Sequence, residues 1–199
     1  MILRHRLVVL AVPLAVSLGL ATPAHAWPLV IRTATFAPWN MTAPPTAVTY
    51  DQALVRTGAS ISVVAMSSSE DRTTVVLLQV HGLAPDHRYG VHVHRNRCGA
   101  VPAAAGSHYQ NVPDPVAPSV DPAYANPRNE VWLDLSTDHA GAGSSFAILQ
   151  WRFRAGQANS VVLHADSTMT GSGHAGTAGP RVACLTVPFQ PVSLIWASG

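Results

Sequence analysis

Residues 73–94 read TTVVLLQVHGLAPDHRYGVHVH, and this stretch determines the fold that we expect. It holds two runs rich in β-branched and aliphatic residues, 73–80 and 89–94, on either side of the turn-forming residues Ala84-Pro85-Asp86. This spacing predicts two short strands. Similar runs occur at 60–66, 131–137, 145–153, 160–164 and 182–189. Because no stretch of ten or more residues keeps a helical period without interruption, the sequence predicts an all-β domain, an antiparallel sandwich or barrel of about eight strands.

Two segments between the expected strands are longer than a hairpin requires. Residues 99–129 are rich in proline, and residues 165–180 consist mainly of Ser, Thr, Gly and Ala. Long loops on a β scaffold usually carry function. We therefore expect these two loops to contribute to the functional site.

The N-terminal residues 1–26 have the features of a cleaved secretory signal peptide. Arg4 and Arg6 precede an apolar run of about fifteen residues, and Ala24-His25-Ala26 follows as a cleavage site. The run is too short for a permanent membrane anchor, so we predict a secreted, periplasmic or cell-surface protein. Residues 27–45 contain four prolines and are expected to form an irregular leader arm, with the β domain at 46–199.

The charge composition excludes nucleic acid as a partner. The chain has 12 basic residues, all arginine, 10 acidic residues and 10 histidines. Loss of Arg4 and Arg6 with the signal peptide leaves 10 arginines against 10 acids, so no excess of positive charge remains for phosphate contacts. Histidine chemistry is therefore the first to consider.

Cys98 and Cys184 are the only cysteines of the chain. In an oxidising compartment they are expected to pair with each other, although two unpaired buried thiols are the alternative. The oligomeric state does not follow from the sequence.

His92 and His94 are two residues apart in an expected strand, so both side chains project from the same face. Two imidazoles on one face of a rigid strand can grip a metal ion, whereas two surface histidines are the alternative. His108 in the first long loop and His164 at the end of an aliphatic run favour the metal.

Several motifs resemble those of copper/zinc superoxide dismutases. The run VHGLAP at 80–85 followed by GVHVH at 90–94 is similar to the segment that leads into the first copper ligands of that family. GSHY at 106–109, LH at 163–164 and AGPRVAC at 178–184 resemble further family motifs and occur in the same order. The resemblance spans roughly 59–189 and implies a Greek-key β fold, a copper cofactor and superoxide as the small-molecule substrate.

The resemblance also implies roles for individual residues. Arg181 corresponds to the guanidinium beside the open face of the copper, and Cys98 and Cys184 correspond to the family's internal disulfide. We assign to His108 the additional role of detaching from copper and carrying a proton. The implied copper ligands are His92, His94, His108 and His164.

The sequence departs from the family pattern at the zinc site. No histidine lies between Asn111 and Asp138, so we expect a copper-only variant that lacks zinc. One of the carboxylates in this region, Asp114, Asp121, Glu130 or Asp134, could accept the other ring N–H of His108, and of these we choose Glu130. The loop at 165–180 carries one charge, Asp166, so the family's charged guiding loop is largely missing. The function expected is a superoxide dismutase, with a non-catalytic copper-binding or copper-buffering sandwich as the alternative.

Overall fold

The computed structural model describes residues 29–68 and 70–189. The expected signal peptide at 1–26 lies outside these ranges. Nearly all regular structure is β. The elements are β1 (Leu29–Ala37), β2 (Ala47–Thr49), β3 (Ser60–Ser67), β4 (Thr74–His81), β5 (Arg88–Tyr89), β6 (Val91–His94), the 3₁₀ helix η1 (Pro102–Ala105), β7 (Leu135–Ser136), β8 (Gly143–Leu149), β9 (Ser160–His164) and β10 (Arg181–Thr186). No helix in the described ranges is long and apolar enough to cross a membrane.

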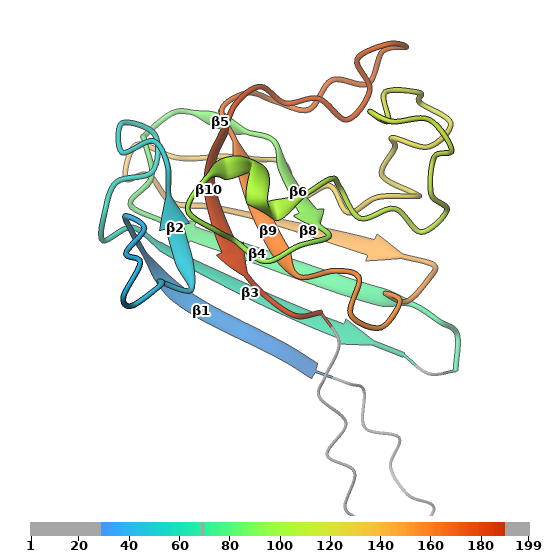
Figure 1. The fold of residues 1–199 in the computed structure, drawn as a ribbon, viewed down its shortest axis with the longest axis horizontal. Coiled ribbons are helices and arrows are strands. Elements are labelled where there is room, and N and C mark those ends of the chain that lie inside the picture. Colours follow the sequence, from blue (N-terminus) through green and yellow to red (C-terminus); the bar gives the residue numbers. More distant parts are fainter. Residues whose placement is uncertain (1–28, 69, 190–199) are drawn as a thin grey trace, which may run out of the picture.

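Eight of these strands form one curled sheet in the order β6-β9-β10-β2-β1-β3-β4-β8, and β5 pairs with β7 separately. The sheet folds into a half-barrel, with β1, β3, β4 and β8 across from β10, β9 and β6 (Figure 1). The prediction of an all-β domain of about eight strands is confirmed. The pairing of β1 with β2 is parallel, however, so the sheet is mixed.

The core lies inside the curl of the sheet. Alternate residues of β3 and β4, such as Ile61 and Leu78, are at most 1% exposed and belong to the same apolar cluster as Leu163 of β9 and Leu185 of β10. Alternation in a strand sends every second side chain to the same face. Both halves of the sheet therefore contribute one face to a shared interior, and the strands that carry the functional site pack on it.

Within the range 27–45, which we expected to be an irregular arm, residues 29–37 form a strand, whereas 38–45 contain none. Residues 29–37 form β1, which pairs with β3 from Leu29 to Thr35 and inserts the buried Phe36 into the core. The prolines at 28 and 38 flank this strand and do not interrupt it. Arg32 breaks the apolar alternation of the inward face, which is why the strand pattern is weak in the sequence. The β domain therefore includes β1 and does not begin at 46.

Several expected strands are shorter in the structure, including those at 131–137 and 145–153. Within 131–137, only Leu135–Ser136 form a strand. The residues before them make isolated hydrogen bonds with β6 and no continuous ladder; one of these bonds joins Leu133 N–H to the Val91 carbonyl oxygen at 2.7 Å. Strand β8 ends at Leu149, and Trp151 and Phe153 are buried beyond it in irregular backbone. Trp151 and Phe153 therefore pack in the core although the strand has ended before them.

Cys98 and Cys184 form a disulfide, as predicted, with a sequence separation of 86 residues. Cys184 lies in β10, and Cys98 lies in the loop between β6 and η1. The bond therefore ties the start of the first long loop to the central region of the sheet.

Candidate metal centre

The four predicted ligand histidines meet at one place. Strand β6 supplies two of them and pairs antiparallel with β9, which ends at the third. The fourth follows η1. Its segment forms an isolated β-bridge with His94, and the next residue, Tyr109, donates its N–H to the Val93 carbonyl oxygen at 2.8 Å. One ring nitrogen from each imidazole lies within 4.8 Å of those of the others. The four are His92, His94, His108 and His164.

Two of the imidazoles are oriented by backbone carbonyls. His94 Nδ1 lies 3.0 Å from the Gly106 carbonyl oxygen, and His164 Nδ1 lies 3.1 Å from the Gly179 carbonyl oxygen. A nitrogen that faces a carbonyl must carry the proton, so Nε2 of each ring keeps its lone pair. These two Nε2 atoms lie 3.4 Å apart, and both face the centre of the cluster.

His92 is oriented by a side-chain relay. Its Nε2 lies 2.7 Å from Thr168 Oγ1, and the Thr168 hydroxyl donates in turn to Asp134 Oδ1 at 2.7 Å. Since this hydroxyl proton is used by Asp134, the threonine oxygen accepts from His92 Nε2–H. The other nitrogen, His92 Nδ1, is buried and has no hydrogen-bond partner.

His108 is oriented by a carboxylate. Its Nδ1 lies 2.8 Å from Glu130 Oε2, and this oxygen also accepts from Trp132 Nε1–H at 2.7 Å. Gln110 donates to the other carboxylate oxygen at 2.8 Å. Glu130 is 1% exposed, so this buried charge is compensated by three donors. The structure thus places Glu130 beside His108, at the nitrogen that points away from the cluster.

The site residues fit a bound metal ion. A buried polar nitrogen without a partner costs free energy, and a metal ion at the cluster would accept the His92 Nδ1 lone pair. Each of the other three rings likewise directs one nitrogen to the cluster and has the other fixed by the protein, which is the usual arrangement of metal-binding histidines. Four imidazoles suit copper, zinc or nickel more than magnesium or calcium.

Burial keeps these histidines neutral. Desolvation, followed by the neighbouring His108 and other charges, holds the pKa of His92 and of His94 well below 6.5. The same desolvation lowers the pKa of His164 to about 4. Metal binding requires the neutral imidazole, so near pH 7 these rings are already in the binding form.

Arg181 begins β10 and is in register with His164 on β9. Its guanidinium donates to the carbonyl oxygens of Pro102 at 3.1 Å and Gly106 at 2.7 Å. Burial lowers the pKa of Arg181 from 12.5, but a guanidinium remains charged at neutral pH. Because the Gly106 carbonyl also accepts from His94, the arginine and the histidine cluster are held by the same turn.

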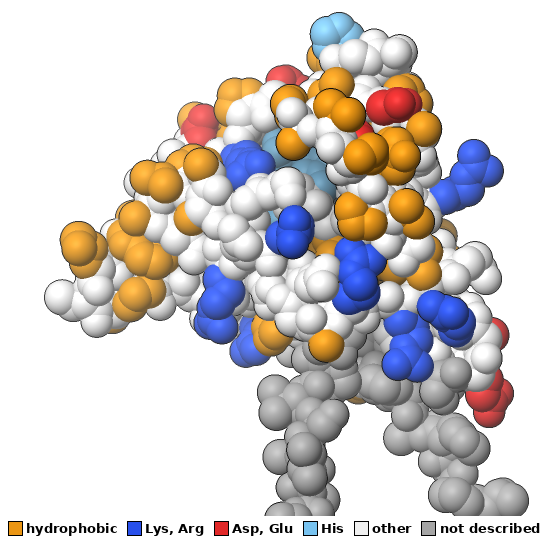
Figure 2. Space-filling model, turned by 45° about the vertical axis from the view of Figure 1, so that its right-hand side comes forward, with side chains coloured by type: hydrophobic (Ala, Val, Ile, Leu, Met, Phe, Trp, Pro, Cys, Tyr) orange, Lys and Arg blue, Asp and Glu red, His pale blue; other side chains and the backbone are white. Residues whose placement is uncertain are grey.

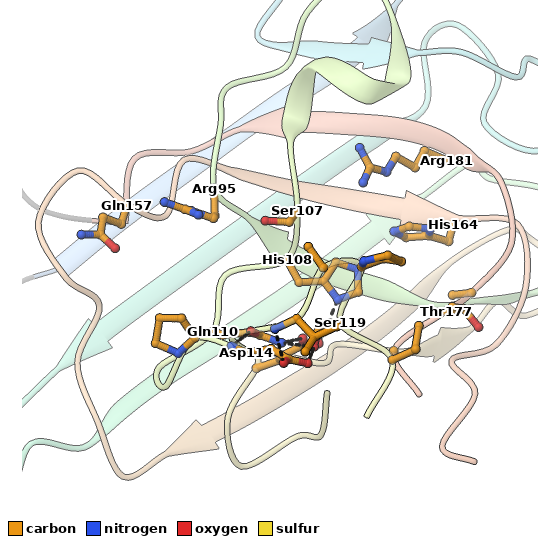
Figure 3. A pocket seen from close by; sticks show the side chains of 18 of the residues that line it. Arg95, Ser107, His108, Gln110, Asp114, Ser119, Gln157, His164, Thr177 and Arg181 are labelled. Carbon is orange, nitrogen blue, oxygen red and sulfur yellow. Dashed lines mark hydrogen bonds and ion pairs between the residues drawn. The ribbon is translucent and has the colours of Figure 1, made fainter. Parts of the chain in front are cut away.

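A cavity of about 580 Å³ opens over this cluster, and His108, His164 and Arg181 line it. Figure 2 shows the pale blue histidine side chains at the bottom of a hollow, with arginine at one edge and hydrophobic side chains at the other. In Figure 3, His108 lies between Arg181 and the group formed by Gln110, Asp114 and Ser119. The histidine cluster is therefore open to small molecules from one side.

Some residues that orient the ligands gave no signal in the sequence. The carbonyls of Gly106 and Gly179 act through their backbone atoms, which no side-chain pattern reveals. Thr168 lies in a Ser, Thr and Gly rich loop in which several hydroxyls look equivalent. Asp134 is one of several carboxylates near the site, and only the fold shows that it reaches Thr168.

Comparison with solved structures identifies the architecture. The Cu/Zn superoxide dismutase from Brucella abortus matches with a TM-score of 0.51 and 17% sequence identity, over 79% of this chain and 99% of that protein. The fold is that of copper/zinc superoxide dismutases. No family model matches the sequence, and no curated protein does. The superoxide dismutase fold and the histidine cluster thus agree with the resemblance found in the sequence motifs.

Proposed function

We propose that this protein is a secreted, copper-dependent superoxide dismutase that works without zinc. The observation that carries the proposal is the arrangement of the four histidines, each with one ring nitrogen fixed by the protein and the other directed to a shared centre. Four imidazoles suit copper, and copper bound there would supply a one-electron couple. Similarity to the fold of a Cu/Zn superoxide dismutase supports the same assignment.

Glu130 supports the zinc-free part of the proposal. The nitrogen of His108 that points away from the cluster hydrogen-bonds to this buried carboxylate. A carboxylate there fixes the tautomer of His108 and raises the basicity of its other nitrogen. No second metal ion is needed for either effect.

Arg181 and His108 have separate roles in the proposed reaction. Arg181 attracts superoxide and orients it without losing its own proton. One superoxide gives up an electron and leaves as dioxygen, while a second takes that electron with two protons and leaves as hydrogen peroxide. We assign the delivery of a proton to His108, and its position in a loop that lines the cavity supports this role.

Secretion is also part of the proposal. The sequence features of residues 1–26 and the Cys98–Cys184 disulfide both favour an oxidising compartment. We propose a secreted, periplasmic or cell-surface location after cleavage of these residues, without a permanent membrane anchor and without a nucleic-acid partner.

The alternative is a non-catalytic copper-binding or copper-buffering protein, which the single charge in the loop at 165–180 favours. Copper-loaded Arg181→Gln protein separates the two. If the protein is a superoxide dismutase, we expect the variant to remove superoxide at least about tenfold more slowly than wild type with unchanged copper affinity, because the guanidinium acts on the substrate. Equal rates in wild type and variant would support the buffering protein. His108→Ala with unchanged copper affinity and turnover would contradict the role of His108.

A further inference from the structure

The cavity over the histidine cluster is much larger than superoxide requires. Its volume is about 580 Å³, whereas a water molecule, which is comparable in size with a diatomic anion, occupies roughly 30 Å³ of liquid. Pockets for organic ligands commonly have volumes of about 300–1,000 Å³. The size therefore corresponds to an organic molecule.

One wall of this cavity is cationic. Arg95, Arg154 and Arg181 line it, and none of them forms an ion pair with a carboxylate in the described part of the chain. Arg154 donates to the carbonyls of Gln110 and Asn111, and Arg181 donates to those of Pro102 and Gly106. Arg95 has an exposed side chain and lines the cavity on the side of Gln157 (Figure 3), so it is available to a ligand.

The acidic residues of the cavity do not neutralise this wall. Asp114 accepts the Ser119 hydroxyl at 2.7 Å and the Val116 N–H at 2.8 Å. Glu130 is buried and accepts from three donors, including His108. Both carboxylates are thus held on the side of the loop at 110–120, which leaves the charge on the opposite wall available for an anion.

The other wall is apolar and exposed to solvent. The cavity-lining residues of this wall come from one segment, and Val116 is 67% exposed. Figure 2 shows hydrophobic side chains at the border of the hollow. Apolar surface that faces a cavity is stabilised when a ligand covers it. The segment contributes Pro113, Val116, Ala117, Pro118 and Val120.

We propose that this cavity binds a small organic carboxylate, with its anionic group at Arg95 and its apolar body against the wall at 113–120. Carboxylates match the planar donor geometry of guanidinium groups. The inference deepens the proposed function, since such an anion would lie beside the copper site. Its test uses metal-free protein, so the carboxylate site and superoxide removal can fail separately.

Isothermal titration calorimetry of the metal-free protein with benzoate tests the proposal. Benzamide keeps the ring without the charge, and acetate keeps the charge without the ring. We expect benzoate to bind at least about tenfold more tightly than either compound, because only benzoate uses both walls. Benzoate binding no tighter than benzamide, or no heat up to millimolar concentrations, would overturn the proposal.

Two matched pairs of variants test which wall of the cavity contacts the carboxylate of benzoate and which contacts its ring. Arg95→Gln should weaken benzoate about tenfold without changing benzamide, whereas Arg88→Gln, an exposed arginine outside the cavity, should leave benzoate unchanged. Val116→Ser should weaken benzoate but not acetate, with the exposed Val101→Ser as its control. Equal affinities of benzoate for Arg95→Gln, Arg88→Gln and wild type would contradict the site. Thermal melts confirm that each variant is folded.

Discussion

Replacement of the buried Glu130 tests most directly how the protein orients His108, the neighbouring candidate metal ligand. Glu130→Gln keeps the size of the side chain but removes the charge that faces His108 Nδ1. We expect copper affinity to fall about 10- to 100-fold, as for other residues that orient metal-binding histidines. Competition titration with a chelator measures this. Asp86→Asn, which disrupts the exposed pair of Asp86 with His139, is the control, and equal affinities for the two variants would contradict the role of Glu130.

Protonation of the buried histidines predicts how the stability of the metal-free protein depends on pH. The pKa values of His92, His94 and His164 are lower in the folded chain than the 6.5 of an exposed histidine. Below pH 6.5 the unfolded chain therefore takes up protons that the folded chain excludes, and the free energy of unfolding falls as pH falls toward about 4. Denaturant midpoints at pH 7 and pH 5 measure this, and an unchanged midpoint would contradict it.

Single residues of the site could be predicted where their chemistry is visible in the sequence. The spacing of His92 and His94 indicates a shared face, and Glu130 was selected because His108 needs an acceptor. Thr168 could not be predicted, because its role depends on the approach of its loop to Asp134. Gly90 permits this kind of approach, since a Cβ there would lie 2.7 Å from the Asp166 carbonyl oxygen.

Strand β1 was the element that the sequence concealed, and its contribution can be measured. Phe36→Ala removes a fully buried ring and should lower the free energy of unfolding by about 3–5 kcal/mol. Thr35→Ala changes the neighbouring exposed side chain and should lie within about 0.5 kcal/mol of wild type. Denaturant unfolding compares the two. Similar values for both variants would mean that β1 is not part of the folded core.

The Cys98–Cys184 disulfide links β10 to the loop that leads to His108. It closes a segment of 86 residues, for which chain entropy predicts roughly 4–5 kcal/mol of stabilisation. The double variant Cys98→Ala and Cys184→Ala should lose about this amount. It should also weaken copper binding, because the loop between Cys98 and His108 supplies the Gly106 carbonyl. Urea unfolding and chelator competition test the two effects, and a loss under about 1 kcal/mol would contradict the first.

For the molecule as a whole, the class of fold followed from the sequence more readily than the sheet topology. Alternating and aliphatic runs predicted the strands β3, β4, β6, β9 and β10. The parallel pairing of β1 with β2 could not be predicted, because register between distant segments depends on how the whole sheet closes. The same limit applies to the cavity, which segments far apart in the sequence build together.

The most direct test of the account is superoxide decay after a superoxide pulse, measured on protein loaded with one equivalent of copper, with and without one equivalent of zinc. In the proposed site the four histidines, with His108 fixed by Glu130, need no zinc, so we predict rapid removal that zinc does not change. A zinc-free rate no faster than that of the same amount of albumin-bound copper, or activity that appears only after zinc is added, would contradict the account.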